Sequence, residues 1–243
     1  LLLTQQGKLS QAEELFEKTL IQAQKINNKV IYCVSLSNLA NINEDSGRFE
    51  KAIKLNKMIL KVDPYYVWSN YYLSMVFYKM GEIDKAKSIL EKQIKEKKEI
   101  FYYIGLALVN SVLGKMKQAD ELLNRGLTLI KTENPDISTK IESFLKVTQF
   151  YYENKKFKDS LNFSKKIMEL TNSLSKEYNI ASAFLKINNF NIKSINKIDI
   201  IQETERLKEI GCIYDYAYVK KLQIESMINT DIKQDEIKNI TEE

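Results

Sequence analysis

The sequence predicts an all-α protein, an α-solenoid of about six antiparallel helix hairpins. Three observations support this prediction. The 243-residue chain contains only 7 Gly and 2 Pro, so its turns must be short and its helices many. A glycine followed five residues later by an alanine recurs along the chain. Apolar and small residues also recur at fixed distances on both sides of these glycines, which indicates a repeated structural unit.

The copies of this unit align on the glycine. Four copies carry both residues of the pair, and a fifth replaces them with Lys155 and Ser160. The intervals between successive copies are 40, 34, 33 and 41 residues. The four complete pairs are Gly7–Ala12, Gly47–Ala52, Gly81–Ala86 and Gly114–Ala119.

Each copy is predicted to form a helical hairpin. The glycine ends the first helix in the left-handed conformation, which only glycine adopts without a Cβ penalty. Lys155 must therefore bear that penalty or use a different turn. The small residue five positions later is expected where the two helices approach most closely, because a larger side chain would force them apart.

The first copy consists of its second helix and a short apolar remnant, residues 1–6. Ser10 and Glu13 have the spacing of a capping box at the start of this helix. Because the leading helix is missing and the chain does not begin with Met, we expect the chain to be part of a longer protein.

The two prolines are predicted to open the first helices of the third and fifth hairpins. Asp63 is expected as an N-cap with Pro64 as the first helical residue. Asn134 and Pro135 are expected to play the same two roles before the fifth hairpin.

Residues 171–243 depart from the repeat frame and are predicted to form divergent helical repeats of the same solenoid. Helices are expected near 173–188, 199–210 and 213–229, with Asp199 as a cap and Gly211 as a stop. The polar tail from 231 onward is expected to fray.

Residues 1–170 resemble the tetratricopeptide repeat, a 34-residue unit of two antiparallel helices. The resemblance is clearest in "NYYLSMVFYKMGEIDKAKSILEK" and "LSNLANINEDSGRFEKAIKLNKMILKVDP". It implies a right-handed superhelix and a non-catalytic module that binds protein or peptide segments. The intervals near 40 are similar to the longer, MalT-like variant of signalling proteins, which implies a signalling or transcription-regulatory role.

Composition narrows the function further. The net charge of +5 comes from closely mixed signs, which is typical of solvated helix faces. Cys33 and Cys212 lack metal-ligand spacing and are expected to be small core residues in a reducing compartment. No apolar run approaches the roughly 20 residues of a membrane helix. We therefore expect a cytoplasmic protein without a membrane association.

No enzymatic motif is recognisable, so the chain is not expected to be an enzyme, and no cofactor or metal site is predicted. The sequence has no histidine, no glycine-rich phosphate loop and no CxxC. The adjacent carboxylates Glu13/Glu14 and Glu44/Asp45 are expected to be solvent-exposed charges that point apart along their helices.

The concave face of the superhelix is the expected binding surface, because the first helix of each hairpin lines it. Asn38 and Asn41 are predicted to hold the backbone of an extended peptide. Apolar side chains of that peptide would be buried by Trp68, Tyr72, Met75, Phe101 and Leu108. Tyr71 and Lys79 lie on the same stripe. Ordinary packing between repeats is the alternative for these residues, above all for Trp68.

A protein or peptide segment is thus the expected partner, without direct contact to nucleic acid. One alternative is a scaffold that self-associates through its end helices, since a homo-oligomer is compatible with the sequence. A second alternative is a regulator linked to nucleic acid through the basic excess.

Overall fold

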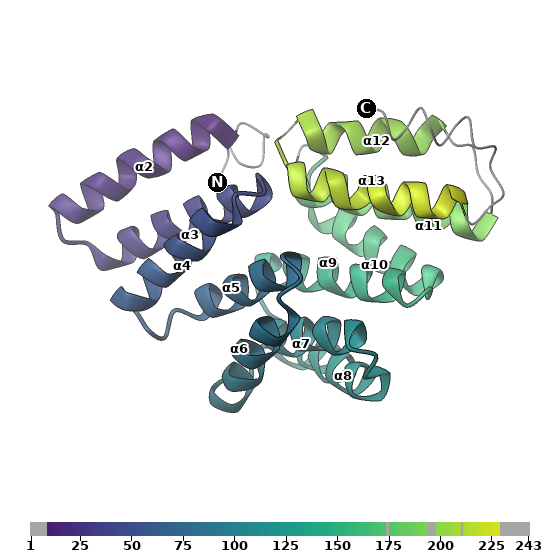
Figure 1. The fold of residues 1–243 in the computed structure, drawn as a ribbon, viewed down its shortest axis with the longest axis horizontal. Coiled ribbons are helices and arrows are strands. Elements are labelled where there is room, and N and C mark those ends of the chain that lie inside the picture. The colour runs from purple at the N-terminus through teal and green to yellow at the C-terminus, as the bar shows by residue number, and fades with distance from the viewer. Residues whose placement is uncertain (1–8, 174, 194–197, 210, 229–243) are drawn as a thin grey trace.

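The computed structural model describes residues 9–173, 175–193, 198–209 and 211–228, and within these ranges it contains helices and no strands. The predicted all-α solenoid is confirmed (Figure 1). The helices are α2 (Leu9–Lys25), α3 (Lys29–Asp45), α4 (Phe49–Val62), α5 (Val67–Lys79), α6 (Ile83–Glu96), α7 (Ile100–Val112), α8 (Met116–Glu133), α9 (Ile137–Glu153), α10 (Phe157–Leu170), α11 (Lys176–Lys193), α12 (Ile198–Glu209) and α13 (Ile213–Ile228).

The predicted left-handed turns end the inner helices. Gly47, Gly81 and Gly114 have φ angles of 72°, 78° and 71°. At each turn the glycine N–H donates three residues back, and the next N–H donates five residues back. This pair of bonds satisfies the last carbonyls of the helix. Gly7 lies outside the described residues.

Two residues other than glycine make the same turn. Lys155 adopts a φ of 58°, so it bears the left-handed penalty and uses no alternative turn. Asn27, with a φ of 52°, forms an equivalent turn between α2 and α3 that the repeat frame did not include. Asparagine tolerates this conformation better than most residues, because its side chain can form local hydrogen bonds.

The predicted helix starts at the prolines are wrong by two to three residues. The backbone N–H of Asp63 still bonds to the Ile59 carbonyl at 2.8 Å, so Asp63 ends α4, and α5 begins only at Val67. Asn134 closes α8 in a left-handed conformation. Asp136 instead caps α9.

The expected capping box after Gly7 is not formed by Glu13. Ser10 lies inside α2, and the carboxylate of Glu13 contacts Arg48 at 2.8 Å and Lys51 at 2.9 Å on α4. Glu13 therefore connects two outer helices.

The small residues of the repeat lie at the helix contacts, as predicted. Ala52, Ala86, Ala119 and Ser160 are completely buried, and Ala12 is nearly so. The Ser160 hydroxyl also donates to the Thr148 carbonyl at 3.0 Å, which ties α10 to α9. The register of the sequence repeat is therefore the register of the packing.

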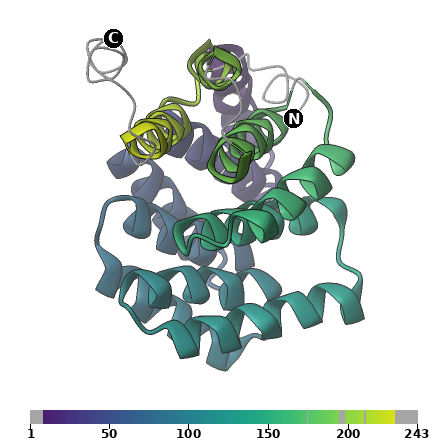
Figure 2. The same ribbon diagram turned by 90° about the vertical axis from the view of Figure 1, so that its right-hand side faces the viewer.

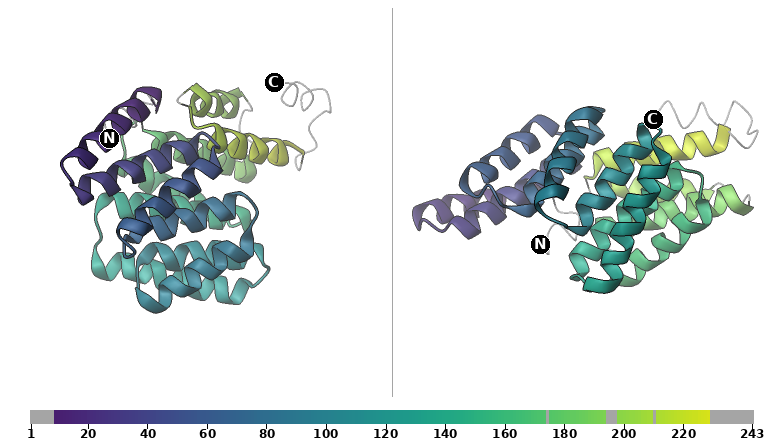
Figure 3. Two further views of the ribbon diagram at one scale, coloured as in Figure 1. Left: turned by 60° about the vertical axis from the view of Figure 1, so that its left-hand side comes forward. Right: turned by 90° about the horizontal axis from the view of Figure 1, so that it is seen from below.

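The helices form an inner and an outer layer. Each odd-numbered helix from α3 to α13 contacts the next odd-numbered one, and the even-numbered helices cover them from outside. The last inner helix, α13, also contacts the first, α3, so the inner layer closes on itself. Figure 2 shows the successive helices stacked in layers, and Figure 3 shows the N-terminal helices beside the C-terminal ones.

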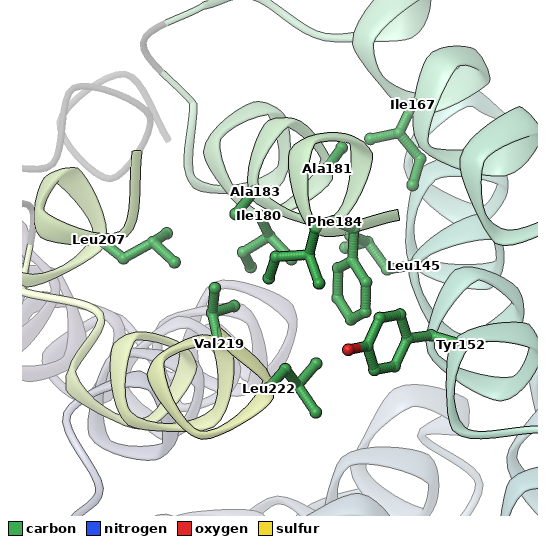
Figure 4. Packing of buried hydrophobic residues seen from close by; sticks show 11 residues of the cluster. Leu145, Tyr152, Ile167, Ile180, Ala181, Ala183, Phe184, Leu207, Val219 and Leu222 are labelled. Carbon is green, nitrogen blue, oxygen red and sulfur yellow. The ribbon is translucent and has the colours of Figure 1, made fainter. Parts of the chain in front are cut away.

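The hydrophobic core is a series of clusters along the solenoid rather than one centre. The last cluster joins α9 and α10 to the divergent C-terminal helices. In it, Phe184 of α11 packs edge-on against Tyr152 of α9, with ring centroids 5.5 Å apart (Figure 4). The described C-terminal helices therefore pack directly on the helices that precede them.

Helix α7 is enclosed along nearly its whole length, and every residue from 100 to 110 is buried. It packs between α5 and α9 in the inner layer and against α6 and α8. A helix that is apolar on all sides needs such surroundings. Consequently α7 contributes to the core and not to the hollow of the superhelix.

Candidate functional site

Two cavities occupy the hollow of the superhelix. The wide cavity has a volume of about 630 Å³ and lies between α3, α5, α9 and the start of α11. The ionic cavity has a volume of about 140 Å³ and lies between α3, α5, α9, α11 and α13. The two share six lining residues: Asn41, Asp45, Tyr72, Glu142, Lys176 and Glu177. They are therefore neighbouring parts of one inner site.

The wide cavity has a mixed polar and apolar lining. Helix α3 contributes Ser37, Asn38 and Asn41, while α5 contributes Trp68 and Tyr72. The opposite wall comes from the start of α9 and from the α10–α11 connection. Its residues include Asp136, Ile137, Ser138, Ile141, Leu170, Thr171 and Asn172.

Six of the nine predicted site residues line these cavities. Asn38, Asn41, Trp68 and Tyr72 line the wide cavity, and Met75 and Lys79 line the ionic one. Met75 is only 2% exposed, so most of its surface contacts the chain itself.

The other three predicted residues lie in the core, which corrects the expectation that they face the hollow. Tyr71 and Leu108 are completely buried, and Phe101 is 3% exposed. Phe101 stacks on Trp68 with ring centroids 4.5 Å apart and also touches Tyr71. For these residues, packing between repeats is the observed role. The positions of Phe101 and Leu108 follow from the burial of α7, whose apolar sequence on all sides was the available signal, and Tyr71 of α5 packs against Phe101.

Of the carboxylates expected to be exposed, Glu14 is exposed, whereas Glu44 and Asp45 are buried. Glu44 is 7% and Asp45 is 8% exposed. Glu44 forms an ion pair with Lys79 of α5 at 2.8 Å, and Asp45 forms one with Lys176 of α11 at 2.8 Å. The Glu44–Lys79 pair joins the inner helices of adjacent repeats, whereas the Asp45–Lys176 pair joins helices far apart in the sequence, which the repeat pattern alone could not reveal.

The surroundings shift the pKa values of these charges. Burial raises the pKa of Asp45 to about 6, even though Lys176 and Lys79 oppose the rise, and nearby Asp215 adds to it. Burial lowers the pKa of Lys79, but the carboxylates of Glu44, Asp215 and Asp45 outweigh it and hold this pKa above its usual value. In the ionic cavity, burial thus disfavours the charge of Asp45, while the neighbouring carboxylates keep Lys79 charged.

Tyrosine hydroxyls bind further carboxylates around the hollow. Tyr71 donates to Glu142 at 3.1 Å, and Tyr218 of α13 donates to Glu153 of α9 at 2.7 Å. Burial and the adjacent Glu153 raise the pKa of Tyr218. These tyrosines remain protonated donors, and they connect α5 and α13 to α9.

The two predicted asparagines differ in their free hydrogen-bonding groups. The Asn38 amide donates one N–H to the Val34 carbonyl of its own helix at 2.8 Å, so one of its two donors is occupied. The amide oxygen of Asn41 is buried and accepts no hydrogen bond within the described part of the chain. A buried acceptor without a partner is costly, and a ligand donor can satisfy it.

Sequence reasoning missed the wall supplied by α11 and α13. Lys176, Glu177, Tyr214 and Asp215 lie in the region that departs from the repeat frame. Tyr214 holds the Lys79 ammonium 4.4 Å from its ring centroid and packs against Phe49, with ring centroids 5.6 Å apart. These residues reach the site only because the inner layer closes.

Both cysteines are buried and free, as predicted. No group of His, Cys, Asp and Glu suited to a metal ion is found in the described ranges. Of the helices that the structure describes, none combines the length and the apolarity needed to span a bilayer.

Comparisons with known proteins agree with the fold. A family model described as tetratricopeptide repeat matches residues 1–64. A chain of the anaphase-promoting-complex heterotetramer Cut9–Hcn1 superposes with a TM-score of 0.61 over 95% of this chain, at 14% identity. The present chain spans only 42% of that chain's length. No match was found among curated proteins.

Two smaller proteins superpose with lower scores. TTC0263, a thermophilic repeat protein from Thermus thermophilus, gives a TM-score of 0.45 at 17% identity, with 65% of this chain and 91% of that chain covered. YrrB, a TPR protein with an unusual peptide-binding site, superposes with a TM-score of 0.39 at 16% identity, with 83% of this chain and 97% of that chain covered.

Proposed function

Because the chain folds as a solenoid of tetratricopeptide-repeat type, we propose that it is a non-catalytic module that binds a peptide segment of a partner protein in the wide cavity. The observation that supports this proposal is the cavity of about 630 Å³ with a mixed lining on the inner face. Its size and composition are those of a site that recognises a few side chains of a ligand.

The walls of this cavity suit an extended peptide. Trp68 and Tyr72 stack with ring centroids 5.6 Å apart and offer an aromatic surface, with Ile137 and Ile141 on the other wall. Asn41 also lines this cavity, and its amide carries both the donor and the acceptor groups that a peptide backbone requires. Aromatic side chains combined with a few polar groups are the usual composition of such recognition sites.

Blocking the cavity tests the proposal. Ser138 lines the wide cavity and is exposed in the first turn of α9, so Ser138→Tyr should obstruct the site without disturbing the core. The wild-type chain is used to select binders from a random dodecapeptide display library. We expect the selected peptides to bind the Ser138→Tyr variant at least tenfold more weakly in calorimetry.

The matched control is Ser88→Tyr, on the solvent-facing side of the outer helix α6, which should bind like the wild type. The pair Asn38→Ala and Asn41→Ala provides a second variant of the site. The absence of any selected binder, or binding that all these variants leave unchanged, would refute a peptide site in this cavity.

Self-association is a second candidate, favoured by the exposed apolar side chains at the N-terminal edge. Leu15 is 52%, Val30 74% and Val34 44% exposed on α2 and α3. Unpaired apolar surface at the end of a solenoid usually contacts another repeat. A mass from light scattering that stays monomeric across concentrations would contradict this candidate.

The wider context follows from the resemblance alone. The long intervals between repeats support a place within a larger signalling or transcription-regulatory protein, in the cytoplasm, where the module would report binding to another domain. Capture of the same peptide by a longer natural protein, with a changed output, is the measurement that would support this role.

A further inference from the structure

Building on the proposed peptide site, we infer that the bound segment places a lysine or arginine side chain in the wide cavity, so that the preferred partner is a basic peptide. The inference rests on three observations: the charge of the lining, the absence of partners for particular acceptors, and the position of the aromatic rings.

The lining of the wide cavity is acidic, although the chain as a whole carries +5. Asp45, Asp136, Glu142 and Glu177 face a single lysine, Lys176. The adjoining ionic cavity adds Glu44 and Asp215 against Lys79 and Lys146. Six carboxylates thus surround the two cavities with three lysines among them, and a carboxylate-bearing ligand would be repelled.

The three lysines are already paired within the chain. Lys79 contacts Glu44 at 2.8 Å, Lys176 contacts Asp45 at 2.8 Å, and Lys146 contacts Glu142 at 3.8 Å. They are therefore not available as anchors for an acidic group. The arrangement differs from a groove in which free lysines bind a terminal carboxylate.

Some acceptors of the inner site make no direct contact with a cation, although the charges of Asp215 and Glu177 act on the neighbouring lysines Lys79 and Lys176. Asp136 is used as the cap of α9, where it accepts from Thr139. Glu177 and Asp215 take part in no ion pair or hydrogen bond with the described residues, yet both line the inner site. The buried amide oxygen of Asn41, which borders both cavities, is likewise unpaired within that part of the chain.

The aromatic wall lies beside these acceptors. Trp68 and Tyr72 line the same cavity as Glu177 and Asn41. An ammonium or guanidinium group is attracted to the exposed face of an aromatic ring. A basic side chain would find carboxylate, amide and aromatic partners together, whereas a neutral side chain would use only the last.

The experiment compares matched forms of a peptide selected with the wild-type chain. Each basic residue of the peptide is replaced in turn by norleucine or glutamine, and dissociation constants are measured through the fluorescence of Trp68, which is the only tryptophan in the sequence. We expect one basic residue whose replacement weakens binding about tenfold or more, as for a charge-assisted contact.

Two variants assign that residue to the cavity. Glu177→Gln should weaken the basic peptide about tenfold and leave the norleucine form nearly unchanged. Glu121→Gln, at an exposed position on the outer helix α8, should leave both affinities unchanged.

The experiments distinguish a failure of the inferred basic residue from a failure of the proposed peptide site. Selected peptides that the Ser138→Tyr variant excludes, but that contain no essential basic residue, would overturn this inference and leave the proposed peptide site intact. Binding that depends on a basic residue but is insensitive to Glu177→Gln, and to Asp215→Asn as a second variant, would also overturn it. Peptides that ignore Ser138→Tyr would refute the peptide site itself.

Discussion

Individual residues at the ends of the inner helices set the repeat. Gly47, Gly81 and Gly114 occupy left-handed positions with open space around the missing Cβ, so their backbone angle and not their small size is what matters. Lys155 occupies the equivalent position with a φ of 58°. The fifth copy is thus degenerate in sequence but not in geometry.

Lys155→Gly should stabilise the protein, because it removes the Cβ penalty of the left-handed conformation. The gain in the free energy of unfolding should be about 0.5–1 kcal/mol, since the greater freedom of glycine in the unfolded chain cancels part of it. Urea denaturation measures the change. Lys165→Gly, at an exposed position inside α10, is the matched control and should destabilise by about 1 kcal/mol. A destabilising effect of Lys155→Gly would contradict the strain.

At the scale of elements, the start of α9 depends on one side chain. The Asp136 carboxylate accepts the Thr139 N–H at 3.0 Å and the Thr139 hydroxyl at 2.7 Å. These hydrogen bonds lower the pKa of Asp136 below the ordinary value of 3.8. The helix therefore begins at Ile137 rather than at the preceding proline.

Asp136→Ala should destabilise the protein by about 1 kcal/mol at neutral pH, the usual cost of losing an N-cap. Because the pKa is lower in the folded state than in the unfolded state, this stabilisation is complete above the unfolded pKa. It is lost as the pH falls through the folded pKa. Thermal unfolding of both proteins between pH 7 and pH 3 should show the difference shrinking below about pH 4.

Asp136→Asn separates the charge from the cap. Asparagine caps helices about as well as aspartate, so this variant should resemble the wild type at pH 7. Since the amide does not titrate, its difference from Asp136→Ala should persist at low pH. If the difference in stability between the wild type and Asp136→Ala did not depend on pH, the ionised carboxylate would not be the form that caps the helix.

The ion pair between α3 and α5 predicts a non-additive effect. Lys79→Met leaves Glu44 buried without its partner, which should cost about 3–5 kcal/mol. Adding Glu44→Gln should recover much of this loss, because the double variant no longer buries an unpaired carboxylate at this position. Chemical denaturation of the single and double variants measures the coupling.

The exposed pair Lys18–Glu14 on α2 is the matched control. Its side chains are 69% and 67% accessible, so Lys18→Met should change stability by less than about 0.5 kcal/mol. If Lys79→Met were equally mild, the inner pair would not hold α3 against α5.

At the scale of the whole molecule, closure of the inner layer creates the site. Helix α13 contacts α3, and Phe49 packs against Tyr214. Leu9 of α2 lies so close to Gly211 that an added Cβ would come within 3.1 Å of it. The hollow of the superhelix is therefore enclosed by both the N-terminal and the C-terminal helices. A single repeat could not form this site.

Tyr214→Ala should loosen this closure, because it removes the ring that contacts Phe49, Tyr218 and Lys79. We expect a larger radius of gyration in small-angle X-ray scattering with unchanged helical circular dichroism. Tyr65→Ala, at a 75% exposed position between α4 and α5, should leave the radius unchanged. An unchanged radius for Tyr214→Ala would mean that other contacts suffice to close the layer.

The helical hairpins, their register and the turns that end them could be predicted from the sequence, because these depend on local backbone conformation and on small residues at fixed spacing. The sequence also placed Asn38, Asn41, Trp68 and Tyr72 on the inner stripe. We did not predict from the sequence that α7 is enclosed on all sides, although the continuous apolar run of this helix indicates such burial.

Which inner residues remain accessible, and which charges form pairs, depends on the complete superhelix. Asp45 and Lys176 are 131 positions apart, and Tyr71 and Glu142 are 71 apart. Their meeting depends on the curvature that small rotations accumulate over all the repeats, and no local pattern encodes that sum. The acidic character of the cavity is for the same reason a property of the closed superhelix, not of any single repeat.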